Sequence, residues 1–121
     1  MSKYVISAAS ALSILLGGTV LVSTSASAAE MNAVSEGKKV AFHRKKGNCL
    51  ACHAIEGGNL PGNIGPPLVN MKDRYPDKSK LKAQIWDATT NNPNSIMPPF
   101  GKHKILNEKE LDLVVEFIYS L

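Results

Sequence analysis

Two cysteines and a histidine in one short segment constrain this chain more than any other feature of its sequence. The two cysteines, Cys49 and Cys52, enclose two residues, and His53 follows directly. In a single helical turn, such cysteines lie on the same side, so both thiols can reach one flat ligand. Cys-x-x-Cys-His is the attachment signature of c-type haem, in which the thiols bond to the porphyrin vinyl groups and the histidine ligates iron. The segment predicts one covalently bound haem c, with His53 as the proximal ligand.

Three other uses of these cysteines fit the rest of the chain less well. A thioredoxin-like redox pair needs a βαβ pattern, and no strand alternation of useful length is present. Half a zinc site would need two further ligands, for which only His43 and His103 remain. A structural disulfide would leave a short, loop-rich chain without the cofactor that its small core needs. Haem attachment is therefore the favoured interpretation.

The N-terminal segment has the pattern of a secretory signal. Lys3 precedes an uncharged run over 5–22, and Ala26-Ser27-Ala28 offers the small residues that signal peptidase requires. We predict a signal peptide over 1–28, cleaved after Ala28, and one cytochrome c domain over 29–121 in the periplasm. An uncleaved membrane anchor is the alternative, but the run is rich in serine, threonine and glycine, and no basic stop-transfer cluster follows. No stable membrane insertion is expected.

The remaining chain alternates between helical stretches and loops rich in proline, glycine and asparagine. Apolar residues at helical spacing predict three helices, over about 35–46, over about 79–89 and from Asn107 onward. We expect Ser79 to cap the second helix, and Asn107 with Glu110 to form a capping box on the third. The segment 57–67 must be a loop, because proline lacks an N–H and glycine is entropically costly. The pattern predicts an all-α domain with long loops around a flat cofactor.

Four side chains are candidates for the iron ligand opposite His53, namely Met71, Met97, His43 and His103. Met97 is the best of them, because the proline-rich segment 95–101 is stiff enough to hold a thioether against the ring. Met71 stands beside charged residues and is expected to pack. His103, between two lysines, is the second choice. If none binds, the open iron position would suit a ligand-sensing or peroxidase-like protein.

The proximal histidine also needs a hydrogen-bond partner. A ligating histidine usually donates its second ring N–H to a carbonyl, which orients the ring. A proline carbonyl after the glycine-rich loop could accept it, or Pro66 and Pro67 could only shape the turn.

The net charge of the chain limits which classes of partner are expected. The formal net charge is only +4, and the two propionates of a haem would lower it, so nucleic acid is not an expected partner. A basic run precedes the cysteines, made of Lys38, Lys39, Arg44, Lys45 and Lys46. This run either steers an acidic protein partner or is an ordinary solvated face.

Several segments together resemble the class I cytochromes c over the whole of residues 29–121. They are the signature 49–53, Gly65-Pro66-Pro67-Leu68, Met97-Pro98-Pro99 and the amphipathic last helix. The resemblance implies a class I cytochrome c fold, in which the Pro66 carbonyl accepts from the proximal histidine. It also implies that His53 and Met97 are the two iron ligands, and that Cys49 and Cys52 hold the ring.

The resemblance is imperfect on the first helix. The class I family packs a glycine and an aromatic residue, four positions apart, against the last helix. Here Gly37 is followed at that distance by Ala41, and Phe42 comes one residue later. The register of this helix crossing is therefore open.

A closer resemblance is to the SoxX family. It rests on residues 47–53, 62–68, 74–78 and 97–103, of which the second and fourth stretches are the most specific. SoxX is the monohaem subunit of the periplasmic SoxAX complex, an L-cysteine S-thiosulfotransferase that oxidatively couples thiosulfate to a carrier-protein cysteine. The resemblance implies a heterodimer with a SoxA-like haem protein and a downstream cytochrome as electron acceptor.

The cysteine count assigns this chain the electron-carrying part of such a reaction. Sulfur transfer needs a free thiol or persulfide, whereas Cys49 and Cys52 are both committed to the haem. We therefore expect no catalytic residue in this chain and only indirect contact with the sulfur carrier. The alternative function is a free-standing periplasmic cytochrome c that carries electrons to an oxidase.

Overall fold

The computed structural model describes residues 24–121, so most of the predicted signal peptide, residues 1–23, lies outside the described part. Its elements, in chain order, are α1 (Thr24–Phe42), η1 (Cys49–Ala51), α2 (Met71–Arg74), α3 (Lys78–Trp86), η2 (Ala88–Thr90) and α4 (Glu108–Tyr119). No strand occurs within residues 24–121, and the all-α prediction is confirmed. Over the same residues, no helix is both long and apolar enough to span a membrane.

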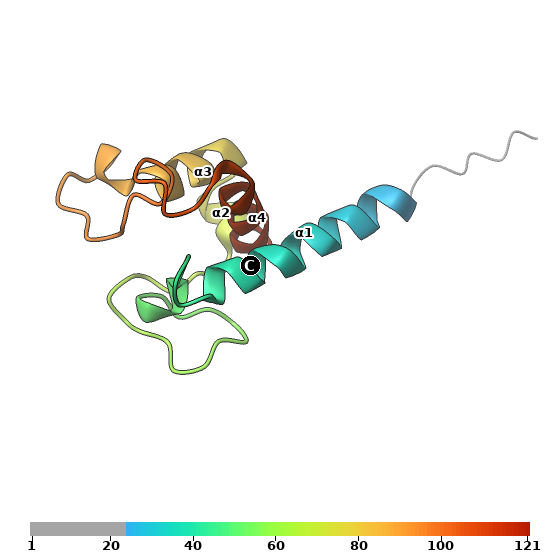
Figure 1. The fold of residues 1–121 in the computed structure, drawn as a ribbon, viewed down its shortest axis with the longest axis horizontal. Coiled ribbons are helices and arrows are strands. Elements are labelled where there is room, and N and C mark those ends of the chain that lie inside the picture. Colours follow the sequence, from blue (N-terminus) through green and yellow to red (C-terminus); the bar gives the residue numbers. More distant parts are fainter. Residues whose placement is uncertain (1–23) are drawn as a thin grey trace, which may run out of the picture.

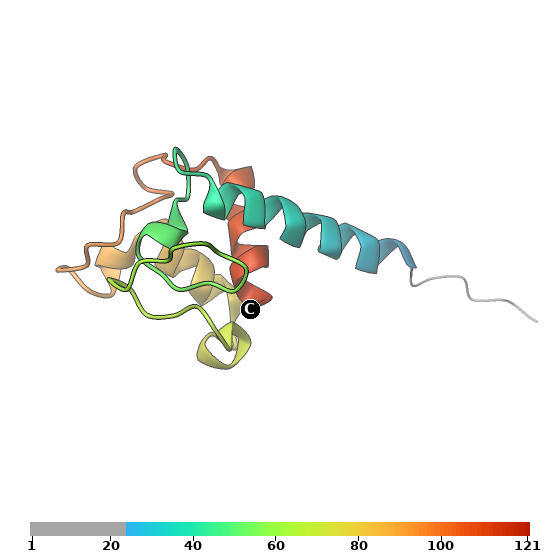
Figure 2. The ribbon, with the colours of Figure 1, turned by 90° about the horizontal axis from the view of Figure 1, so that it is seen from below.

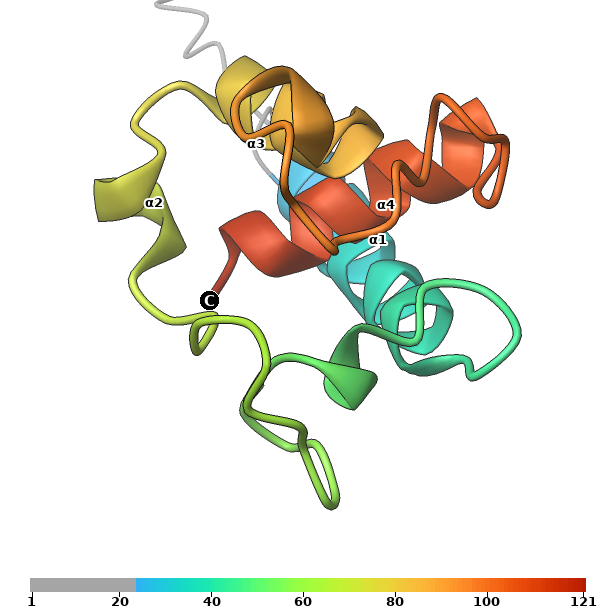
Figure 3. The same ribbon diagram turned by 90° about the vertical axis from the view of Figure 1, so that its left-hand side faces the viewer.

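Helix α4 lies at the centre of the domain, with α1, α2 and α3 around it (Figure 3). The predicted capping box starts it: Asn107 Oδ1 accepts the Glu110 N–H at 2.9 Å, and the Glu110 carboxylate accepts the Asn107 N–H at 3.2 Å. Its apolar stripe is buried and comprises Leu111, Val114, Val115, Phe117 and Ile118. Because this stripe faces both the other helices and the long loops, α4 provides the largest share of the core of any single helix.

Helices α1 and α4 cross in direct backbone contact. A Cβ on Gly37 would lie 1.9 Å from the Leu113 carbonyl oxygen, so only glycine allows this approach. The Phe42 ring meets the Phe117 ring edge to face, with 5.7 Å between the centroids, and Ala41 is fully buried. The crossing therefore uses a glycine and an aromatic residue five positions apart. The N-terminal part of α1 extends beyond the body of the domain (Figures 1 and 2).

The predicted bounds of the first helix were wrong at both ends. Helix α1 starts at Thr24, within a run of alanine and serine, and it ends at Phe42 instead of continuing to about residue 46. The end is set by Gly47, which donates its N–H to the Val40 carbonyl at 3.2 Å and is buried against the helix. The chain thus folds back over the end of α1, and residues 44–47 form a turn.

The second predicted helix is two elements, α3 and η2. Asp77, not Ser79, is the N-cap of α3, and its Oδ1 accepts the Ser79 N–H at 2.9 Å. The helix ends before Asp87, whose carboxylate accepts the Thr89 N–H at 3.0 Å and so starts η2. The four-residue α2 was not predicted, because one turn is too short to show a helical period.

Candidate functional site

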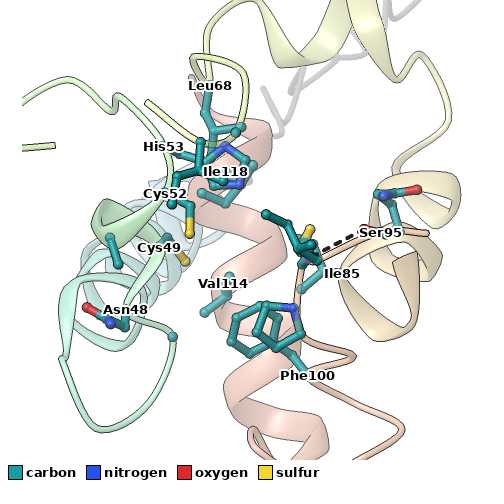
Figure 4. A pocket seen from close by; sticks show the side chains of 18 of the residues that line it. Asn48, Cys49, Cys52, His53, Leu68, Ile85, Ser95, Phe100, Val114 and Ile118 are labelled. Atoms are coloured by element: carbon teal, nitrogen blue, oxygen red, sulfur yellow. Dashed lines mark hydrogen bonds between the residues drawn. The ribbon is translucent and has the colours of Figure 1, made fainter. Parts of the chain in front are cut away.

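A cavity of about 670 Å³ opens between the segment that follows α1, the loop that follows η2, and one face of α3 and α4. Its volume lies in the usual range for cofactor sites. The apolar side chains that line it include Leu68, Leu81, Ile85, Phe100, Val114 and Ile118. Figure 4 shows the cysteines and His53 on one side of this space and Ser95 across from them.

The predicted thiol pair lines one wall of the cavity. Cys49 starts the 3₁₀ turn η1 and Cys52 is its C-cap, and the two side chains lie side by side (Figure 4). The turn is closed by the Cys52 and His53 N–H groups, which both donate to the Cys49 carbonyl, at 3.2 and 2.9 Å. Burial raises the pKa of the Cys49 thiol to about 11. A thiol with this pKa is protonated at neutral pH, which disfavours a role as a free nucleophile.

His53 lines the same wall, and its orientation is fixed from two directions. Its Nδ1 lies 2.7 Å from the Pro66 carbonyl oxygen. Because that oxygen can only accept, Nδ1 carries the hydrogen and Nε2 keeps its lone pair for a metal. A Cβ on Gly65 would lie 2.4 Å from the imidazole Cε1, so the chain passes against the ring only because this residue is glycine. This is the arrangement of a ligating histidine that is held by a backbone carbonyl.

Met97 reaches the cavity from a different part of the chain, the loop between η2 and α4. It is half-buried, and its N–H donates to the Ser95 hydroxyl at 3.3 Å. The prolines on its C-terminal side restrict the backbone there. A thioether on this loop and an imidazole just after η1 thus line one cavity.

The other candidate ligands are less suitably placed. Met71 lines the cavity, but it is only 2 % exposed, and its sulfur accepts from the Arg74 guanidinium at 3.3 Å. His43 and His103 are both exposed and lie outside the cavity lining. His43 Nδ1 instead accepts the Lys45 N–H at 3.1 Å. Met97 is therefore the best-placed side chain opposite His53.

The charges around the cavity also fit a haem. Its lining includes four cationic side chains, Arg44, Lys45, Lys46 and Arg74. None of the described residues that line it is aspartate or glutamate. An apolar space with cations and no carboxylates suits a flat apolar ring that carries two propionates. Cys49, Cys52, His53 and Met97 are the residues that would hold such a group.

Comparison with known proteins agrees with this chemistry. Residues 32–118 match the family described as cytochrome c oxidase, cbb3-type, subunit III. The chain belongs to this family of c-type cytochromes. It is also 33 % identical, over 77 residues, to an uncharacterized lipoprotein of Aquifex aeolicus (strain VF5). That match covers 63 % of this chain and 37 % of the relative, so the chain spans little more than a third of the relative's length.

Membership of this cytochrome c family implies covalently bound haem c and electron transfer. The competing interpretations of the cysteines do not fit. Cys49 and Cys52 are free thiols, without a disulfide. Within residues 24–121, no three histidine, cysteine, aspartate or glutamate side chains gather as a metal site, so the structure gives the zinc interpretation no support. The thioredoxin interpretation fails because this part of the chain has no strand.

Some residues around the site were not predicted. Arg74 Nη1 donates to the Pro67 carbonyl at 2.9 Å and so ties α2 to the proximal loop. Asp87 and Lys102 pair across the base of the loop that carries Met97. The only local signal for Asp87 was its position two residues before a threonine, a spacing that favours an Asx turn. Nothing in the sequence pointed to its pairing with Lys102.

Proposed function

We propose that this chain is the electron-carrying monohaem subunit of a periplasmic SoxAX-type complex. Cys49 and Cys52 would hold one haem c by thioether bonds, and His53 and Met97 would ligate its iron. When bound, the haem supplies an iron that gains or loses a single electron. The complex couples thiosulfate to a carrier-protein cysteine, and the sulfur chemistry lies on a SoxA-like haem partner because this chain has no thiol left for it.

The chain's own residues would set the environment of the iron. The Pro66 carbonyl keeps the hydrogen of His53 on Nδ1, which fixes the ring plane and leaves Nε2 for the metal. The buried side chains of α3 and α4, such as Leu81 and Val114, exclude water from the cavity floor. A thioether ligand and an apolar shell both favour the reduced state and so raise the reduction potential.

Two exposed isoleucines at the mouth of the cavity support the proposal that this chain has a permanent protein partner. Ile64, just before the proximal Gly65, is 63 % exposed, and Ile96, just before Met97, is 76 % exposed. Both line the cavity. Exposed apolar groups at a cavity mouth favour an interaction site, and permanent interfaces are more apolar than transient ones. A SoxA-like subunit seated on these isoleucines would bring a second haem close to this one.

A second candidate is a free-standing carrier that delivers electrons to an oxidase. The cations at the cavity edge favour it, since Arg44 and Lys45 lie on an exposed turn and no described lining residue offsets their charge. Such a patch steers an acidic partner to a transient, salt-sensitive encounter. The downstream cytochrome that accepts electrons from a SoxAX-type complex could dock there as well.

Co-isolation of the mature, haem-loaded protein from periplasm at high salt tests the first candidate. We expect a second haem protein to remain bound, and thiosulfate to reduce the haem of the isolated complex. Ile64→Asp and Ile96→Asp should each abolish this association. Met31→Asp is the matched control, because Met31 is 65 % exposed on α1 and lies outside the cavity lining.

Two results would contradict the SoxAX assignment. One is a cytochrome that elutes alone at every salt concentration, and the other is a complex whose haem thiosulfate does not reduce. The free-standing carrier would then stand if Arg44→Glu with Lys45→Glu slows electron delivery to oxidase-containing membranes, and if added salt slows the wild-type protein in the same way.

A further inference from the structure

The loop that carries Met97 is closed at its base by a small set of contacts, which we call the neck. The neck joins the end of α3 to residues 101–102. The Gly101 and Lys102 N–H groups both donate to the Trp86 carbonyl at 3.2 Å. Lys102 Nζ donates to Asp87 Oδ2 at 2.6 Å. A Cβ on Gly101 would lie 2.0 Å from the Trp86 indole, so the two chain segments touch directly.

Asp87 is the buried member of the ion pair in the neck. It is 6 % exposed, whereas the Lys102 side chain is 56 % exposed. Thr89 donates both its N–H and its hydroxyl to Asp87 Oδ1. On the other oxygen, Oδ2, Lys102 is the one cation that pairs with Asp87 within residues 24–121. These bonds lower the pKa of Asp87 to about 2, the bond from Lys102 most of all. A nearly buried carboxylate depends on its cation, because removal of one member of such a pair leaves an uncompensated charge.

The loop above the neck has few other attachments. In the described part of the chain, the hydrogen bonds of residues 90–97 run only within the segment 87–97 or to Gln84. Residues 90–94 are all exposed. Buried Ala88 and Phe100 anchor the two ends close to the neck. Met97 itself packs against the core, so the hydrogen bonds and the ion pair that fix its loop to the rest of the domain lie mainly at the base of the loop.

We propose that Asp87 and Lys102 are positioning residues for Met97: their ion pair keeps the neck closed, and its loss lets the loop open and frees the iron position opposite His53. This inference rests on the proposed role of Met97 as an axial ligand. Neither Asp87 nor Lys102 lines the cavity, so both would act on Met97 through the loop. Opening of the neck is a local event, which requires less free energy than global unfolding.

Binding of imidazole to the ferric haem of the mature protein tests this inference. Imidazole takes the axial position only when Met97 leaves it, so its apparent affinity reports the open fraction. We expect Asp87→Asn and Lys102→Met to raise that affinity at least about tenfold and to weaken the far-red absorption band of a thioether on ferric iron. If Asp87→Asn fails to fold, Lys102→Met carries the test, because its side chain is mostly exposed.

The ion pair between Lys78 and Glu116 provides matched controls. It has the same donor and acceptor types at 2.7 Å, but it joins α3 to α4 away from the Met97 loop. Glu116→Gln and Lys78→Met should lower the denaturant midpoint without a change in imidazole affinity. If the neck variants and the control variants bind imidazole with equal affinity, the positioning role of Asp87 and Lys102 is overturned. The ligand role of Met97 would not be affected by that result. A wild-type protein that lacks the thioether band would overturn the ligand role of Met97, and the positioning role with it.

Discussion

The two sides of the cavity are built in different ways. On the proximal side, residues 62–68 bond directly across to η1 and the residues after it. The Gly62, Gly65 and Leu68 N–H groups donate to the carbonyls of Leu50, Cys52 and Ala54, at 2.8, 2.8 and 2.9 Å. On the distal side, the Met97 loop bonds mostly to itself and is closed at its neck. His53 is therefore held by its own wall, whereas the position of Met97 depends on contacts at the base of its loop.

The largest effect should follow removal of the thiols. Cys49→Ser with Cys52→Ser should abolish covalent haem attachment, because serine cannot form the thioether bonds. Haem staining on a denaturing gel measures this loss. His43→Ala is the control, since His43 is exposed and lies outside the cavity, and it should stain as strongly as the wild type. A stained double variant would refute attachment at these cysteines.

The next largest effect concerns the tight proximal wall. A Cβ at Gly65 would overlap the imidazole of His53, so Gly65→Ala should lower the free energy of unfolding by about 3 kcal/mol. Gly57→Asn is the control, because Gly57 has a φ of +72°, which asparagine tolerates, and faces only the flexible end of Lys38. It should lower that free energy by less than about 1 kcal/mol. If a denaturant titration shows that both variants lose the same free energy of unfolding, residue 65 does not pack tightly against the His53 ring.

Loss of the Met97 thioether, the proposed second iron ligand, should affect the fold less and the iron specifically. Met97→Ala should keep the covalent haem and a folded domain, lose the thioether band and bind carbon monoxide in the ferrous state. Absorption spectra with and without carbon monoxide measure these changes. Met71→Leu is the control, because Met71 packs in the core and its sulfur faces Arg74. If Met71→Leu removes the band and Met97→Ala does not, the ligand assignment must be reversed.

The smallest effect should appear in acid. Because the pKa of Asp87 is lowered from 3.8 to about 2 in the folded protein, its carboxylate stabilises the neck fully above about pH 4. This stabilisation is lost as the pH falls towards 2, so the thioether band should fade in that range. Hydrogen bonds also lower the pKa values of Asp77 and Glu110, which therefore add to acid unfolding in general. Between about pH 4 and about pH 2, the thioether band of Asp87→Asn should fade less than that of the wild type. If the two proteins lose the band over the same pH range and to the same extent, the Asp87 carboxylate has no role in closing the neck.

The sequence predicted the parts of this structure that depend on neighbouring residues. The Cys49–His53 turn, the capping box of α4 and the irregular segment 57–67 each rest on local chemistry, and each is present. The end of α1 was missed because it depends on Gly47 packing back on the helix, a tertiary contact. The Asp87 to Lys102 pair was missed for the same reason, since it joins two segments across a loop.

The placement of Met97 shows the same division between local pattern and long-range contact. The stiffness of the segment around Met97 was visible in its prolines, and it marked this residue above Met71. The arrangement that holds the loop on the cavity was not visible, because it requires the end of α3 and residues 101–102 to meet. Sequence patterns therefore identified the candidate ligands, but not the contacts that position them.

Hydrogen exchange on the mature, haem-loaded protein tests the contrast between the two walls most directly. The account predicts that the Gly62, Gly65 and Leu68 amides exchange only with global unfolding, because their bonds cross the proximal wall. The Ser95 and Met97 amides should exchange faster, through local opening. Lys102→Met should accelerate the amides of the Met97 loop and of the neck, and it should leave the three proximal amides unchanged. Equal protection of both sets, or acceleration of both sets by Lys102→Met, would contradict a fixed proximal wall and a distal loop held at its neck.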